Sequence, residues 1–154
     1  MKIKLLLLSL AIPMMAGIIG SYLMGDSVTT WFTSLNKPAL SPPNWVFPIV
    51  WTTLYLLMGL SFYLVASSKT RVETLYGSAF YFIQLILNVL WSALFFMFHN
   101  TSIALIELVV LEITIVLTAY YFSKVNKTAA LLLVPYILWV VVAGYLNYMI
   151  IILN

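Results

Sequence analysis

Three apolar stretches of the sequence carry tryptophan and amide side chains at helical spacing. In residues 75–98, Gln84, Asn88 and Trp91 recur at i, i+4 and i+7, and Phe95 continues the same line. Two further stripes have this spacing: Trp51, Tyr55, Met58 and Phe62 in one stretch, and Tyr136, Trp139, Ala143 and Asn147 in another. Aromatic faces with a few polar groups favour a pocket for a flat, mostly apolar ligand. The alternative is that the aromatic stripes pack a core and the amides tie helices together.

Two carboxyl groups, Glu107 and Glu112, lie in a fourth apolar stretch, residues 102–122. At about 1.5 Å per helical residue, Glu112 lies roughly 15 Å from the start of this stretch, which is near the midplane of a bilayer. An ionised carboxylate at that depth is costly, which favours the protonated form. Separated by about 140° around a helix, the two acids do not form a carboxylate dyad. A proton relay or a ligand anchor is one interpretation, and a neutral acid hydrogen-bonded between helices or protomers is the other.

The sequence contains no conventional catalytic motif. Cysteine is absent, which excludes thiolate nucleophiles and thiolate metal sites. A metal site needs several ligands and a haem ligand must lie inside a pocket, so we expect His99, the single histidine, to be an interfacial residue with no metal role. No serine–histidine pair, phosphate loop or cofactor fingerprint is recognisable. The basic residues are scattered at the ends of the apolar stretches, which argues against nucleic-acid binding.

The elements that hold these residues are predicted to be membrane-spanning helices. Of the 154 residues, 64% are hydrophobic and 7% are charged, against a charged share of about 25% in soluble domains. Crossing a bilayer takes about 20 apolar helical residues, and five stretches satisfy this: 3–24, 45–66, 75–98, 102–122 and 128–153. The first stretch has some features of a signal peptide, but its apolar run continues past the usual length of one. We therefore predict an all-α bundle of five transmembrane helices that forms a single domain, residues 1–154, in contact with membrane lipid.

The charges of the connecting segments predict the orientation of the chain. Lys2, Lys4, Lys69, Arg71, Lys124 and Lys127 all fall on the side of the N-terminus, and Lys37 alone falls on the opposite side. Basic residues concentrate on the cytoplasmic side of membrane proteins. We therefore expect a multi-pass protein of the cell membrane with a cytoplasmic N-terminus and with the C-terminus and the first loop outside.

The first loop, residues 25–44, is the only long connection between the predicted helices. Pro38, Pro42 and Pro43 restrict its backbone. Trp31 and Phe32 are too apolar for a loop in water, so we expect the loop to fold back on the helix ends and to act as a lid.

Four blocks of the sequence resemble the TspO/MBR family, the tryptophan-rich sensory proteins and translocator proteins, in a bacterial form. They are WFTSLNKPALSPPNW and VFPIVWTTLY from the first loop onward, QLILNVLWSALFF at 84–96, and PYILWVVVAGYLN at 135–147. The resemblance spans nearly the whole chain, with the blocks in order and correctly spaced. It implies a five-helix bundle, often a homodimer, in which the first loop closes a pocket between the helices.

The resemblance also implies ligands: porphyrins such as protoporphyrin IX, synthetic isoquinoline carboxamides and, in animal members, cholesterol. No resident cofactor is implied, since the porphyrin is a ligand. The positions that match the family pocket are Trp31, Phe32, Trp51, Tyr55, Asn88, Trp91, Trp139, Ala143 and Leu146. Phe32 stands where a tyrosine is common, and the chain after Tyr148 lacks the Arg or Lys of the animal-type sterol motif.

Three functions follow as hypotheses. The first is a membrane receptor or sensor for tetrapyrroles, held by stacking on tryptophans. The second is light- and oxygen-dependent degradation of a bound porphyrin, which requires no acid–base residues. The third is transport of porphyrins or other small amphipathic molecules, although the internal repeats usual in secondary transporters are not evident in five spans.

Overall fold

Five long helices form the protein, as predicted. The computed structural model describes residues 2–69 and 71–154. The helices are α1 (Ile3–Met24), α3 (Val46–Ala66), α4 (Val72–Ser92), α5 (Thr101–Val125) and α6 (Lys127–Leu153). Each is long and apolar enough to cross a membrane, α1 and α4 being counted with the short turns that extend them. The described residues contain no strand, so the prediction of an all-α bundle of five membrane-spanning helices is confirmed.

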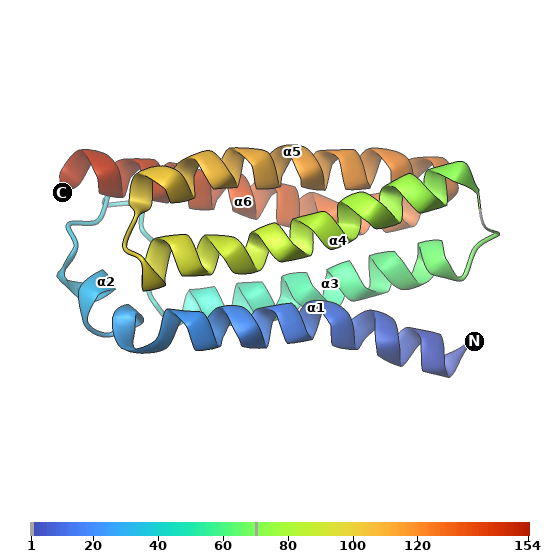
Figure 1. Ribbon diagram of the computed structural model, residues 1–154, viewed down its shortest axis with the longest axis horizontal. Helices are drawn as coiled ribbons and strands as arrows, with labels where there is room; N and C mark the ends of the chain where they lie inside the picture. Colours follow the sequence, from blue (N-terminus) through green and yellow to red (C-terminus); the bar gives the residue numbers. More distant parts are fainter. Residues whose placement is uncertain (1, 70) are drawn as a thin grey trace.

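The helices pack around a ring in the order α1, α3, α6, α5, α4 and back to α1. This order differs from the chain order, because α3 is followed in the ring by α6 and not by α4. Figure 1 shows the helices running along one long axis, with the N-terminus at one end and the first loop and the C-terminus together at the other. The end with the first loop is called the loop end below.

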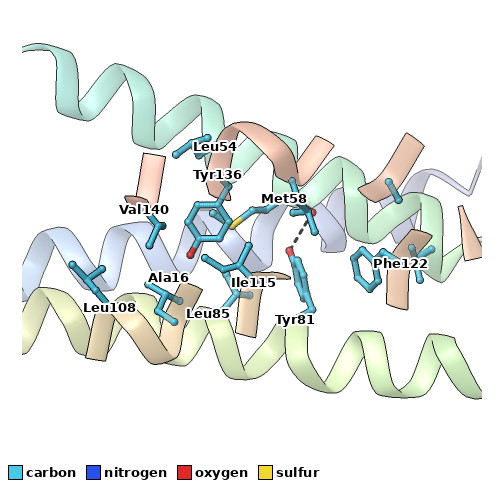
Figure 2. Close-up of a cluster of buried hydrophobic side chains, with 14 residues drawn as sticks. Ala16, Leu54, Met58, Tyr81, Leu85, Leu108, Ile115, Phe122, Tyr136 and Val140 are labelled. Atoms are coloured by element: carbon cyan, nitrogen blue, oxygen red, sulfur yellow. Dashed lines mark hydrogen bonds between the residues drawn. The ribbon is translucent and has the colours of Figure 1, made fainter. Parts of the chain in front are cut away.

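The centre of the bundle is packed with apolar side chains from all five helices. Figure 2 shows ten of them: Ala16, Leu54, Met58, Tyr81, Leu85, Leu108, Ile115, Phe122, Tyr136 and Val140. The Tyr81 hydroxyl donates to the Met58 carbonyl oxygen at 3.3 Å, which pairs a polar group that would otherwise be buried alone. This solid packing leaves the loop end as the place where a cavity can form.

The first loop is more ordered in structure than its sequence predicts. It contains a 3-10 turn, η1 (Gly25–Val28), and a single helical turn, α2 (Trp31–Ser34). As expected, the loop folds back on the helix ends, where Phe32 packs on Phe96 with ring centroids 5.5 Å apart. Its far end is fixed to the C-terminus, because the Asn36 backbone N–H donates to Asn154 Oδ1 at 2.9 Å and Asn154 Nδ2 donates to the Asn36 carbonyl at 3.1 Å.

A π-helical turn, η2 (Ala93–Met97), ends α4. Its backbone widens so that the Phe98 N–H donates to the Ala93 carbonyl oxygen at 2.9 Å. Such turns shift the following side chains around the helix axis and are frequent at functional sites. Here Phe95 and Phe96 are both buried and pack against the first loop.

Candidate ligand-binding cavity

A cavity of about 260 Å³ lies at the loop end between α1, α3, α4, α6 and the first loop. Its wall consists of Gly17, Gly20, Ser21, Met24, Val28, Phe32, Pro38, Ser41, Asn44, Phe47, Pro48, Trp51, Tyr55, Asn88, Trp91, Ser92, Phe95, Phe96, Trp139, Ala143, Leu146, Asn147 and Ile150. Most of these side chains are apolar or aromatic, and three of them are indoles. The wall therefore suits a flat apolar body that carries a few polar groups.

Eight of the nine residues that the family resemblance assigns to the pocket line this cavity. They are Phe32, Trp51, Tyr55, Asn88, Trp91, Trp139, Ala143 and Leu146. They come from α2, α3, α4 and α6, so segments far apart in the sequence converge on one hollow. Their role in binding a ligand stays a prediction.

Trp31 is the ninth residue, and the structure places it outside the cavity wall. Its indole stacks on the His99 imidazole with ring centroids 4.2 Å apart and meets Phe95 edge-on at 5.5 Å. Consecutive residues of a helical turn point about 100° apart, so when Phe32 faces the cavity its neighbour Trp31 faces the α4–α5 connection. His99 also lies within 3.3 Å of the Ser27 hydroxyl through Nε2. Trp31 therefore fastens the first loop to the bundle.

Lys37 does not line the cavity either. Its ammonium lies 4.1 Å from the centroid of the Phe32 ring, in a cation–π contact at the edge of the loop. Neither Trp31 nor Lys37 therefore lies where it would meet the carboxylates of a ligand in the cavity.

The contribution of α1 to the cavity was missed by sequence reasoning. Gly17, Gly20 and Ser21 line the cavity from α1, and they do so because they lack bulk. A Cβ atom on Gly17 would overlap the Tyr55 ring, so this glycine allows Tyr55 to lie against α1. The signal in the sequence was the cluster of small residues at 16, 17, 20 and 21, which allow close helix packing.

A chain of buried hydrogen bonds ties α3, α4 and α6 together beneath the cavity. The Tyr55 hydroxyl donates to Asn88 Oδ1 at 2.8 Å, and Asn88 Nδ2 donates to the Tyr136 hydroxyl at 3.1 Å. The Tyr136 hydroxyl in turn donates to Gln84 Oε1 at 2.9 Å. Gln84, Asn88 and Asn147 are all buried, as the sequence requires, because an amide in contact with lipid is costly. The interpretation of the amides as ties between helices therefore holds for Gln84 and Asn88, and also for Asn147, which donates to the Thr101 carbonyl oxygen of α5. Asn88 and Asn147 line the cavity as well.

Two polar atoms of residues in the cavity wall are buried without a hydrogen-bond partner within residues 2–69 and 71–154. They are Trp91 Nε1 and Asn147 Oδ1. Asn147 is held in place because its Nδ2 donates to the Thr101 carbonyl oxygen at 2.7 Å. A buried donor or acceptor without a partner is costly, so a polar ligand atom that reached either group would remove that cost.

The two acids of α5 lie away from the cavity wall. Glu107 is buried, and neither of its carboxyl oxygens has a hydrogen-bond partner in the part of the chain that the structure describes. Glu112 is half-buried, and its Oε2 is likewise unpaired within the described residues. Their positions favour neither a ligand anchor nor a hydrogen bond between helices of one chain.

The sequence profile of the TspO/MBR family matches residues 9–153 of this chain. The chain belongs to the TspO/MBR family. Its resemblance to that family, seen first in four sequence blocks, is thereby confirmed. As a TspO/MBR protein with five apolar helices of spanning length, it is a multi-pass membrane protein.

Relatives in the TspO/MBR family cover almost the full chain. The tryptophan-rich protein TspO of Chlorobaculum tepidum is 40% identical over 154 residues, which are 99% of this chain and 98% of the relative. The protein of the same name from Archaeoglobus fulgidus is 38% identical, with 100% and 99% covered. The translocator protein of Bos taurus is 34% identical, with 89% of this chain and 82% of the relative covered.

Proposed function

We propose that this protein is a membrane receptor or sensor that binds tetrapyrroles of the protoporphyrin IX type in the cavity at the loop end. The observation that carries the proposal is the convergence of three indoles, Trp51, Trp91 and Trp139, on one apolar hollow. The name of one relative, the tryptophan-rich sensory protein of Cereibacter sphaeroides, supports the sensor role.

The chemistry of a porphyrin matches the cavity wall. Its wide aromatic ring stacks on indole faces, and such contacts contribute beyond the area that they bury. Trp91 Nε1 is a donor for a carboxylate or carbonyl oxygen, whereas Asn147 Oδ1 is an acceptor for the O–H of a protonated carboxylic acid group. Isoquinoline carboxamides, with one flat ring system and one amide, would use the same groups.

The size of the cavity gives the first loop its role in this proposal. At about 260 Å³ the hollow is slightly smaller than the range of roughly 300–1,000 Å³ usual for ligand pockets. A porphyrin therefore requires the wall to widen, and the first loop, which contains two short helical turns, is the part of the wall that can move without displacing a long helix. We assign the loop the function of a lid, fastened by the Asn36–Asn154 hydrogen bonds and by the Trp31–His99 stack.

Titration of the protein in lipid nanodiscs with protoporphyrin IX tests the proposal. We expect the Soret band to shift and to saturate at one porphyrin per chain, because stacking on indoles changes the environment of the macrocycle. Empty nanodiscs of the same lipid provide the control for partitioning. A spectral change that rises without saturation, equal to that of empty nanodiscs, would exclude the cavity as a porphyrin site.

Light-dependent degradation of the porphyrin is a second candidate function. The same indoles favour it, because an excited porphyrin transfers energy to oxygen and the products form beside side chains that are readily oxidised. Under illumination in air, we expect the Soret band of the bound porphyrin to decay faster than that of porphyrin in empty nanodiscs. The acceleration should disappear when oxygen is removed. Equal decay rates with and without protein would rule out this activity.

The remaining assignments rest on the sequence. The distribution of Lys and Arg supports a cytoplasmic N-terminus in the cell membrane, with the first loop and the cavity at the outer face. A homodimer, implied by the family, stays a prediction. Transport is the alternative function, in which Glu112 could act as a proton relay, but Glu112 lies outside the cavity wall.

A further inference from the structure

A second hollow lies on the outer flank of the bundle, along the seam between α3 and α6. This groove has a volume of about 410 Å³ and is lined by Ile49, Val50, Thr53, Leu54, Leu57, Pro135, Leu138, Trp139 and Val142. Thr53 is its one hydroxyl-bearing residue, and the Thr53 hydroxyl donates to the Ile49 carbonyl oxygen of its own helix at 2.9 Å. The groove therefore offers an apolar surface to the hydrocarbon of the bilayer.

Trp139 belongs to both hollows, because it lines the cavity on one side and the groove on the other. Neighbouring residues on each helix show that the wall between the cavity and the groove is thin. On α3, Val50 lines the groove and Trp51 the cavity, while on α6, Val142 lines the groove and Ala143 the cavity. The wall between cavity and bilayer is thus a single layer of side chains in which the Trp139 indole is the largest.

Near this wall, α3 and α6 are joined by aromatic contacts, Phe47 with Trp139 and Trp51 with Tyr136, and by no hydrogen bond within the described residues. Among the described residues, the one hydrogen bond between these helices runs from the Ser61 hydroxyl to the Ala129 carbonyl oxygen, at 2.7 Å. Ser61 lies near the end of α3 and Ala129 near the start of α6, which are the ends of these helices remote from the first loop. Trp139 itself is held by an edge contact with Phe47, with ring centroids 5.9 Å apart. Rotation of this indole therefore breaks no hydrogen bond between the two helices.

We propose that Trp139 is the gate of a lateral portal, through which the flat amphipathic ligand of the cavity passes to and from the bilayer between α3 and α6. The inference rests on the proposed function, since it concerns the same ligand and cavity. A ligand of this class dissolves in hydrocarbon far better than in water, so a lateral path spares it a passage through water. The first loop yields to the size of the ligand as its lid, but a path under the loop leads to the water at the end of the bundle, where a mostly apolar ligand is least soluble.

Filling the groove tests the portal without changing the cavity. Thr53→Phe places a ring in the groove, whereas Thr52→Phe places the same ring on the adjacent exposed position, which lines neither hollow. Proteoliposomes are mixed with protoporphyrin IX by stopped flow, and protein-free liposomes give the rate of the preceding partition step. We expect Thr53→Phe to slow both association and dissociation about tenfold. The equilibrium Kd should stay within twofold of the parent, because a gate changes rates in both directions alike.

The outcomes separate the portal from the proposed function. If the parent protein binds saturably but Thr53→Phe exchanges the porphyrin as fast as Thr52→Phe, the portal is overturned and the proposed function stands. If Asn154→Ala exchanges the porphyrin faster and Thr53→Phe leaves the rates unchanged, the ligand passes under the first loop. This result also overturns the portal. No saturable binding by the parent protein overturns the proposed function and the portal with it.

Discussion

Replacing Trp51 and Trp139 together by leucine is expected to weaken protoporphyrin IX binding about 100-fold, which corresponds to about 2.7 kcal/mol. Both indoles line the cavity, one from α3 and one from α6. An aromatic contact contributes about 0.5–1.5 kcal/mol beyond the area that it buries, and leucine also removes part of that area. The Kd is measured from the Soret band in nanodiscs, because tryptophan fluorescence would change with the substitution itself.

Trp45→Leu is the matched control for this double variant. Trp45 precedes α3, is 67% exposed and does not line the cavity. We expect its Kd to lie within twofold of the parent. If the double variant bound as tightly as Trp45→Leu, the ligand would have to lie elsewhere, and the tetrapyrrole proposal would lose its site.

Replacing Gly59 by alanine is expected to lower the Tm of the protein by roughly 6–12 °C, given about 2–4 °C per kcal/mol for a chain of this size. A Cβ at this position would lie 2.8 Å from both the Leu10 Cα atom and the Ser9 carbonyl oxygen of α1. These are backbone atoms, so α1 must move away from α3. Overpacking of this kind costs about 3 kcal/mol at the upper end of its usual range.

Gly144→Ala provides the comparison within the same protein. No atom lies within 4 Å of a Cβ built at Gly144, and alanine is favoured over glycine in a helix by about 1 kcal/mol. Its Tm, followed by circular dichroism in detergent, should equal or exceed that of the parent. Equal melting of the two alanine variants would show that α1 and α3 do not approach as closely as described. Because α1 forms one wall of the cavity, Gly59→Ala should also weaken porphyrin binding.

The sequence by itself determined the five helices and the inward orientation of the amides. Both follow from local properties: a run of about 20 apolar residues must span the bilayer, and an amide such as Asn88 is costly in contact with lipid. The eight cavity residues were found through the family resemblance, whose blocks preserve the spacing of side chains along each helix. Periodicity alone placed Trp51, Trp91 and Trp139 on stripes, but it did not say that the stripes face one another.

Only the tertiary structure decided where the hollow lies and what closes it. The ring order that seats α3 beside α6 depends on contacts between segments about 80 residues apart, and hydropathy along the chain carries no information on such contacts. Trp31 stacks on His99 because of the way the single turn of α2 is rotated. A rotation of this turn by one residue would place Phe32 against His99 and Trp31 towards the cavity. Gly17 and Gly20 shape the cavity by lacking side chains. The effect of a missing side chain depends on the neighbouring helix. That helix can fill the space beside the glycine or leave it empty, and only the tertiary structure shows which.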